Sequence, residues 1–197
     1  MYKLHPDNFE GYWYFTIKNC FSDQQLKNIE ALIKQSSPEE KGTMSKSEDK
    51  LIRTSTIRWV HPNNQELSEL YQSLIELVHA ANDTHFKFSL TYLEPLQYTE
   101  YYGHEGGHYD FHVDDTIMLT HNNESRKLSF SLLLNDPETD YEGGDFLFRR
   151  GGGKIEKADI SKGDIMFFAS PVPHKVDVVT RGTRKSLVGW VRGPCWK

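Results

Sequence analysis

The sequence has few of the features that mark secreted, membrane or zinc-binding proteins. Only two cysteines occur in 197 residues, Cys20 and Cys195, and neither has the C-x-x-C spacing of a zinc or redox site. We expect both to be free thiols. No apolar run approaches the roughly 18 residues of a transmembrane helix, and the first residues lack the apolar stretch of a signal peptide. We therefore expect a protein of the cytoplasm of a cell, or of a phage host, without a membrane partner.

An excess of basic residues is also missing. The formal net charge is -5 and the pI is near 6.0, whereas non-specific nucleic-acid binding needs a basic face that neutralises phosphates. The glycine run Gly151 to Gly153 lacks the G-K-[ST] of a phosphate-binding loop, so we interpret it as a hairpin turn. Nucleic acid is therefore not an expected partner.

Hydrophobic periodicity predicts two helices in the first half of the chain. Ser22 and Gln25 form a capping-box pattern that should start the first helix, and the segment Pro62-Asn63-Asn64 should supply an amide N-cap to the second. Between them, residues 36–50 lack periodicity and predict a mobile loop, either a solvated linker or a lid, and residues 51–60 alternate like a strand. The buried stripes are Leu26, Ile29, Leu32 and Ile33 in the first helix, and Leu67, Leu70, Tyr71, Leu74, Leu77, Val78 and Ala81 in the second.

From residue 86 onward the pattern changes to short strand-like runs separated by polar or glycine-rich turns. Such a series predicts a double-stranded β-helix, a cupin-like jelly roll, so the fold class is mainly β with flanking α-helices. One domain should span residues 1–197, with helical support and N-terminal strands in 1–85 and the jelly-roll core in 86–197. The predicted strands are 86–93, 96–102, 108–114, 128–134, 145–148, 164–169, 176–179 and 184–191.

The stretch EGGHYDFHVDD, residues 105–115, contains two histidine–aspartate pairs. A His and an Asp two residues apart on a strand point to the same face and can chelate one metal. Two imidazoles and one carboxylate leave three positions of an octahedral ion open, which suits non-haem Fe(II) oxygenases. His112 with Asp114 and His108 with Asp110 both have this spacing, so spacing alone does not choose between them. A further histidine must complete the set.

The best candidate for that further histidine is His174, at the start of a valine-rich run, with Arg184 ten residues beyond it. This half of the chain contains, in order, a glycine-rich turn, H-V-D, a strand, E-G-G-D, a strand, P-x-H-x-V, V-T-x-G-x-R-x-S and a tryptophan. Over Leu96 to Pro194 it resembles the prolyl 4-hydroxylase-like branch of the 2-oxoglutarate and iron dependent dioxygenases, including small bacterial and phage members. The resemblance implies Fe(II), 2-oxoglutarate and O2, with ascorbate as an optional reductant.

The resemblance also implies which residues form the metal and cosubstrate sites. His112, Asp114 and His174 fall on the iron ligands, which leaves the other pair outside the site. Arg184 falls on the residue that binds the far carboxylate of 2-oxoglutarate, since a planar guanidinium grips a carboxylate with two parallel hydrogen bonds. Ser186, two residues on and on the same face, would add a hydroxyl donor.

Three aromatic positions complete the implied site. Tyr109 falls on a tyrosine of the substrate entrance, and Trp190 on a tryptophan near cosubstrate and substrate. The family's cosubstrate tyrosine falls on Tyr101, with Tyr102 as the alternative, because the segment before the iron-binding strand is one or two residues longer than usual. We expect the chamber to be lined by apolar side chains of the later strands, namely Phe130, Leu132 or Leu134, Phe146 and Phe167.

The implied activity is hydroxylation of prolyl residues in a protein or peptide, with conversion of 2-oxoglutarate to succinate and CO2. The alternatives are a hydroxylase of a free amino acid or small molecule, and a non-enzymatic cupin-like metal-binding module. One expectation comes from strand parity alone. If residues 176–179 and 184–191 form a hairpin, a three-residue loop at 180–182 places His174 and Arg184 on one face, and this loop requires a positive φ at Gly182.

Overall fold

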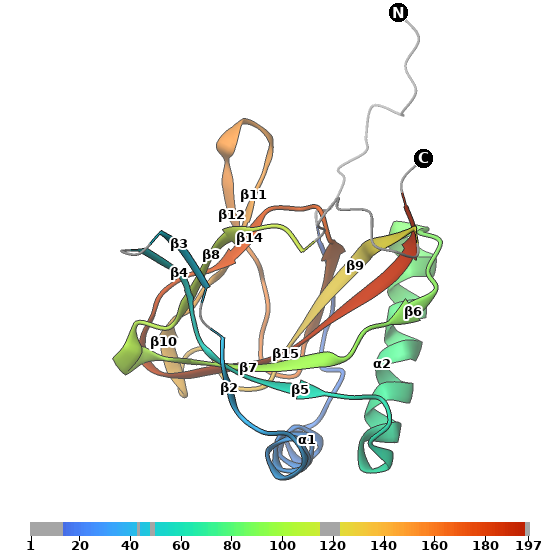
Figure 1. Cartoon of the computed structure of the whole chain (residues 1–197), viewed down its shortest axis with the longest axis horizontal. Helices are drawn as coiled ribbons and strands as arrows, with labels where there is room; N and C mark the ends of the chain where they lie inside the picture. Colours follow the sequence, from blue (N-terminus) through green and yellow to red (C-terminus); the bar gives the residue numbers. More distant parts are fainter. Residues whose placement is uncertain (1–13, 43, 48–49, 115–122, 196–197) are drawn as a thin grey trace, which may run out of the picture.

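Two antiparallel β-sheets pack face to face, and two helices cover the outside of the larger one (Figure 1). The computed structural model describes residues 14–42, 44–47, 50–114 and 123–195. The predicted fold class, a jelly roll braced by N-terminal helices, is confirmed. Within the described ranges, no helix is both long and apolar enough to cross a bilayer.

The strand order of each sheet sets which segments lie side by side. The larger sheet has the order β1-β13-β9-β15-β7-β5-β2, with β10 and β6 also pairing with β15, and the smaller has the order β12-β11-β14-β8-β4-β3. The larger sheet contains β1 (Tyr14–Ile17), β2 (Glu40–Lys41), β5 (Thr56–Val60), β6 (Tyr92–Leu93), β7 (Leu96–Tyr102), β9 (Glu124–Leu133), β10 (Tyr141–Gly143), β13 (Ile165–Ala169) and β15 (Val179–Pro194). The smaller contains β3 (Met44–Ser47), β4 (Lys50–Thr54), β8 (His108–His112), β11 (Phe146–Arg149), β12 (Ile155–Lys157) and β14 (His174–Val176).

Both helices begin where local sequence signals place them. Helix α1 (Asp23–Ser36) has the predicted capping box, in which the Ser22 hydroxyl accepts from the backbone of Gln25 and the Gln25 side chain accepts from the backbone of Ser22. Asn64 caps a short 3-10 turn, η1 (Gln65–Leu67), which leads into α2 (Ser68–Ala81). After α2 a π-turn, η2 (Asn82–Phe86), replaces the start of the strand predicted for 86–93, and only β6 remains of it.

The main hydrophobic core lies between these helices and the larger sheet. Along β9, Leu128, Phe130 and Leu132 face the helices, and so does Phe167 of β13. The alternate residues therefore face the smaller sheet, because side chains on a strand alternate between its two faces. Of the side chains predicted to line the chamber, Phe146 does so, whereas Phe130, Leu132, Leu134 and Phe167 belong to this core, so the prediction is wrong for them.

Residues 36–60 are more ordered than a loop followed by one strand. The predicted loop contains β2, β3 and the start of β4, and residues 43, 48 and 49 of it lie outside the described ranges. The predicted strand 51–60 is divided at Ser55, so that β4 belongs to the smaller sheet and β5 to the larger. Ser55 accepts a hydrogen bond from Arg53 Nε at 2.8 Å and donates to the Gly42 carbonyl at 3.1 Å, which supports the corner.

The predicted hairpin between residues 176–179 and 184–191 is also wrong. Strand β14 pairs with β8 and β11 in the smaller sheet, whereas β15 runs through residues 179–194 in the larger one. Gly182 nevertheless has a φ of 70°. The cause is its pairing with Tyr141 of β10, where a Cβ on residue 182 would collide with the carbonyl oxygen of Asp140.

Replacing Gly182 with alanine should therefore lower the free energy of unfolding by about 1 to 3 kcal/mol, because the left-handed backbone and the close carbonyl both oppose a Cβ. Gly151→Ala is the matched control, since a Cβ there meets no described atom within 4 Å. Urea unfolding followed by circular dichroism measures both changes. Equal stability of the two variants would contradict this account of β10.

Candidate active site

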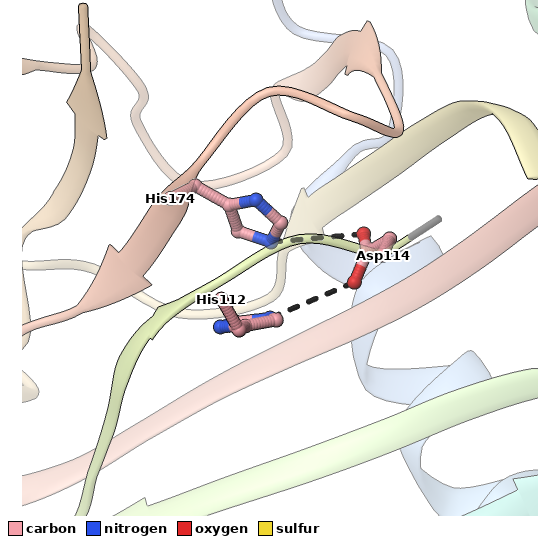
Figure 2. Close-up of side chains that lie close together, drawn as sticks. All are labelled: His112, Asp114 and His174. Atoms are coloured by element: carbon pink, nitrogen blue, oxygen red, sulfur yellow. Dashed lines mark ion pairs between the residues drawn. The ribbon is translucent and has the colours of Figure 1, made fainter. Parts of the chain in front are cut away.

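The smaller sheet brings His112 and His174 together from segments sixty residues apart. The two residues are direct cross-strand partners on β8 and β14, and Asp114 lies just beyond β8, where its backbone N–H donates to the Ser170 carbonyl at 3.0 Å. Figure 2 shows the three side chains converging, with the Asp114 carboxylate facing both rings. One ligand atom from each residue lies within 4.8 Å of the others.

A β-bulge in β8 separates the two histidine–aspartate pairs of the sequence. His174 pairs with His112 and Val176 pairs with Tyr109, so two steps along β14 match three along β8. The extra residue puts Tyr109 and His112 on the same face, where their rings stack at 3.5 Å between centroids. His108 and Asp110 are not brought to the metal-ligand group.

Backbone carbonyls fix the orientation of both imidazoles. His112 Nδ1 lies 2.8 Å from the Asp110 carbonyl oxygen, and His174 Nδ1 lies 2.9 Å from that of Val172. Because a carbonyl oxygen only accepts, each Nδ1 carries the hydrogen, and each Nε2 of a neutral ring presents a lone pair. These Nε2 atoms lie 3.5 and 3.6 Å from the two carboxylate oxygens of Asp114.

Burial makes this arrangement unfavourable without a cation. Burial lowers the pKa of His174 to about 4 against the attraction of Asp114, so this ring is neutral at pH 7. Burial alone would raise the pKa of the Asp114 carboxyl, but His174, His112 and the Ser129 hydroxyl outweigh burial and hold that pKa below its usual range. Among the described residues, Asp114 Oδ2 has no hydrogen-bond partner. Two lone pairs and a carboxylate facing one another are the donor set of a divalent metal site, so these residues fit a bound iron.

Arg184 projects from β15 of the opposite sheet into the same interior. Its side chain is buried, with 1% of the residue exposed, and Nη1 donates to the Ser186 hydroxyl at 3.2 Å while Nε has no partner. The Tyr141 phenol also interacts with the guanidinium, which opposes the rise in the Tyr141 pKa caused by burial. Among the described residues no carboxylate is within ion-pair distance of Arg184. It is therefore a buried cation that lacks an anion.

The structure places Tyr101 beside this arginine. The two residues are cross-strand partners on β7 and β15, and the guanidinium carbon lies 5.8 Å from the centre of the Tyr101 ring. Tyr102 points away from the cavity, and its hydroxyl donates to Glu100 at 3.3 Å. Of the two tyrosines that the sequence left open, Tyr101 is thus the one that lines the cavity.

A cavity of about 350 Å³ between the sheets joins the His–Asp–His group to Arg184. Trp190 lies on its wall with an indole Nε1 that is buried and has no hydrogen-bond partner, and the Trp59 ring lies 6.2 Å away. The described residues that line the cavity include Arg53, Trp59, Gln97, Thr99, Tyr101, Tyr109, His112, Asp114, Arg126, Ser131, Phe146, Phe168, His174, Arg184, Ser186 and Trp190.

One ion-pair cluster at this cavity was not predicted. The guanidinium of Arg126 stacks on Trp190 at 4.1 Å, and its Nε and Nη2 donate to the Glu94 carboxylate at 3.0 and 2.6 Å. Arg192 donates to the same carboxylate. Burial alone would raise the pKa of Glu94, but the two guanidinium groups outweigh it and hold that pKa below its ordinary value of 4.5. The three residues are far apart in sequence, and no local pattern connects them.

Replacing Glu94 with glutamine should lower the free energy of unfolding by about 1.5 to 3 kcal/mol at pH 7, the usual range for hydrogen bonds to a charged group. A carboxyl with a depressed pKa stabilises the fold above its unfolded pKa and loses that effect as the pH falls through the folded value. The difference between variant and wild type should therefore shrink below about pH 4.5. Chemical unfolding between pH 3 and 7 measures this difference in stability. Glu142→Gln is the control, because Glu142 forms an exposed ion pair with Arg181. A loss that does not change with pH would contradict the assignment.

Comparison with known proteins agrees with this geometry. Residues 96–192 match the family model described as the 2OG-Fe(II) oxygenase superfamily. A PKHD-type hydroxylase of Maricaulis maris is 38% identical over 88 residues, an alignment that covers 45% of this chain and 38% of that protein. The aligned part thus spans less than two fifths of the length of the first curated relatives that the chain matches.

Solved structures share the fold over almost the whole chain. A prolyl 4-hydroxylase of Pseudomonas putida superposes with a TM-score of 0.67 at 21% identity, over 91% of this chain and 92% of that one. A prolyl hydroxylase of Trichoplax adhaerens, solved with a peptide fragment of the hypoxia inducible factor, gives a TM-score of 0.70 at 19% identity, over 91% and 83%. At these identities the similarity establishes the jelly roll and not the substrate.

Proposed function

Residues 96–192 belong to the 2OG-Fe(II) oxygenase superfamily, and from this membership we propose that the chain is an Fe(II) and 2-oxoglutarate dependent dioxygenase that hydroxylates prolyl residues of a protein or peptide. One observation carries the proposal. Two buried polar groups of opposite charge, the Asp114 carboxylate and the Arg184 guanidinium, each have an atom without a hydrogen-bond partner, and both line the same cavity. A metal ion at one end and a dicarboxylate reaching to the other would satisfy both.

The residues have separate roles in this proposal. His112, Asp114 and His174 hold the iron, which when bound couples the oxidative decarboxylation of 2-oxoglutarate by O2 to hydroxylation of a C–H bond, with release of succinate and CO2. Arg184 binds the far carboxylate of the cosubstrate, and Ser186 fixes the guanidinium by accepting from Nη1. The buried ring of Tyr101 lies beside the guanidinium and would limit the length of the acid that fits.

The aromatic wall of the cavity supports a prolyl substrate. Trp190, Trp59 and Tyr109 line the cavity that contains the metal ligands, and proline-rich segments characteristically dock against aromatic-lined surfaces. The unpartnered indole Nε1 of Trp190 would donate to a peptide carbonyl. A peptide substrate is also consistent with the structural neighbour from Trichoplax adhaerens, which was solved with a bound peptide.

An array of proline-containing peptides tests the substrate class. Incubation with Fe(II), 2-oxoglutarate and ascorbate should add one oxygen atom to some peptides, detected by mass spectrometry, and each hydroxylation should be matched by one succinate. Peptides with alanine in place of proline should stay unmodified. Hydroxylation of a free amino acid but of no peptide would contradict the proposed peptide substrate and indicate a small-molecule hydroxylase. Metal binding without any succinate would favour a non-enzymatic cupin-like module.

A further inference from the structure

Arg53 is a buried cation on the wall of the cavity that the proposed reaction leaves without a role. It projects from β4, and only 8% of the residue is exposed. Its Nε donates to the Ser55 hydroxyl at 2.8 Å and its Nη2 donates to the Gln97 side-chain oxygen at 2.7 Å. The guanidinium carbon also lies 4.7 Å from the centre of the Tyr109 ring.

All of these partners are uncharged. Within the described part of the chain, no carboxylate lies within ion-pair distance of Arg53, whereas the neighbouring cavity arginine, Arg126, has Glu94. Charged side chains are rarely buried without an opposite charge, because desolvation of an unpaired ion costs several kcal/mol. The two hydrogen bonds hold the guanidinium in place, and its positive charge remains uncompensated at the cavity wall.

The cosubstrate does not supply the missing anion. A divalent iron, the Asp114 carboxylate, the Arg184 guanidinium and doubly charged 2-oxoglutarate have formal charges that cancel. Histidine binds metals as a neutral imidazole, so the two histidine ligands add no charge and the reaction centre is balanced. Because Arg53 has no carboxylate partner among the described residues, we expect the substrate to balance its charge.

The position of Arg53 fixes where that negative charge must be. Tyr109 is its cross-strand partner, and the Tyr109 ring contacts both the guanidinium and the imidazole of His112, on which it stacks with an interplanar angle of 13°. The guanidinium is thus one aromatic ring beyond a metal ligand. An extended peptide rises about 3.3 Å per residue, so a side chain one or two residues from the reacting prolyl would reach it.

We propose that Arg53 selects an acidic residue adjacent to the target prolyl, so that the substrate of this chain is an acidic prolyl peptide. This inference rests on the proposed prolyl hydroxylase function and names its substrate class. If Arg53 had only a structural role, its hydrogen bonds would matter for the fold, but its positive charge would not affect the choice of substrate. Preference between glutamate and glutamine peptides separates the two roles, because these side chains match in shape and differ in charge.

The test compares proline peptides that carry Glu, Gln or Lys at the positions flanking proline. Wild type should hydroxylate the Glu peptides with a kcat/KM at least about 10-fold above that of the Gln peptides, since a charge-assisted pair replaces a neutral one. Arg53→Gln should reduce this ratio to near one, and Arg53→Glu should shift the preference to Lys peptides. Arg58→Gln is the matched control on the next strand, because Arg58 pairs with Glu39 away from the cavity, and it should keep the wild-type ratio.

Equal rates of the wild type on Glu and Gln peptides would overturn the proposal, and so would an Arg53→Gln variant that keeps the preference. If Arg53→Glu does not fold, the Gln variant alone decides. Production of succinate without hydroxylation of any peptide would reject an acidic peptide substrate and leave the oxygenase function standing. Absence of succinate from the iron-loaded wild type would instead reject the proposed function itself.

Discussion

Replacing His112 with alanine is expected to abolish iron binding and, with it, conversion of 2-oxoglutarate. The imidazole Nε2 is one of three donors that converge on one point, and its removal leaves the Asp114 carboxylate and His174 with an incomplete set. Changes to groups that merely orient metal ligands already cost 10- to 100-fold in affinity, so loss of a ligand should cost at least about 100-fold. Anaerobic calorimetric titration with Fe(II) measures the loss directly.

His108→Ala is the matched control for this experiment. His108 lies on the same strand, four residues earlier, and its Nδ1 bonds the Gly106 carbonyl at 2.8 Å outside the ligand group. Iron affinity of this variant should stay within a few-fold of wild type. If His108→Ala lost the metal and His112→Ala kept it, the metal site would have been assigned four residues too far along the chain.

Replacing Arg184 with alanine is expected to raise the requirement for 2-oxoglutarate while iron binding stays nearly intact. The guanidinium is buried, has a hydroxyl and a phenol as neighbours, and lacks a carboxylate among the described residues. Loss of a charge-assisted pair at such a site costs about 2 to 4 kcal/mol, or roughly 30- to 1000-fold in affinity. The dependence of succinate formation on 2-oxoglutarate concentration, together with Fe(II) titration, separates the two effects.

Two further variants test whether the effect is specific to the guanidinium of Arg184. Arg184→Lys keeps the charge but not the pair of parallel hydrogen bonds, so its requirement should be intermediate. Arg181→Ala removes an arginine three residues away that is more than half exposed and pairs with Glu142, and it should behave like wild type. An unchanged requirement in Arg184→Ala would remove this arginine from the cosubstrate site.

Local sequence signals predicted the elements that depend on few neighbouring residues. The capping box of α1 needs only Ser22 and Gln25, and β7 has the predicted bounds because turns and alternation mark both of its ends. The order of the second-half motifs predicted the family. These features can be predicted from sequence because each depends on residues that are close together in the chain.

The β-bulge in β8 is the clearest feature that sequence did not show. Strict alternation gives His108 and His112 the same orientation, whereas the extra residue of the bulge brings Tyr109 and His112 to the cavity together. A bulge depends on the partner strand, and β14 lies sixty residues away in sequence. Parity alone therefore could not choose between the two histidine–aspartate pairs.

Parity also does not tell which face of a strand is the inner one. Along β9 and β13 the large residues Phe130 and Phe167 pack under the helices, while Ser131 and Phe168 face the cavity. Alternation is compatible with large apolar side chains lining the chamber, but the helices form the main core with them. Similarly, alternation gave His174 and Arg184 compatible faces without showing that β14 and β15 belong to opposite sheets.

Pairings between distant segments formed the remaining unpredicted part of the site. Glu94 meets Arg126 and Arg192 only because β15 pairs with both β6 and β9, and Arg53 enters the cavity only because the chain crosses between sheets at Ser55. Neither contact has a signature in the sequence, since the register of the sheets creates it.

The most direct measurement of the central claim is the fate of 13C-labelled 2-oxoglutarate followed by NMR, with the purified chain under air and with or without Fe(II). The site described above predicts labelled succinate only when Fe(II) is present, with slow formation in the absence of substrate and none in His112→Ala. A folded wild-type chain that binds Fe(II) at His112, Asp114 and His174 but forms no succinate, with or without proline peptides, would contradict it.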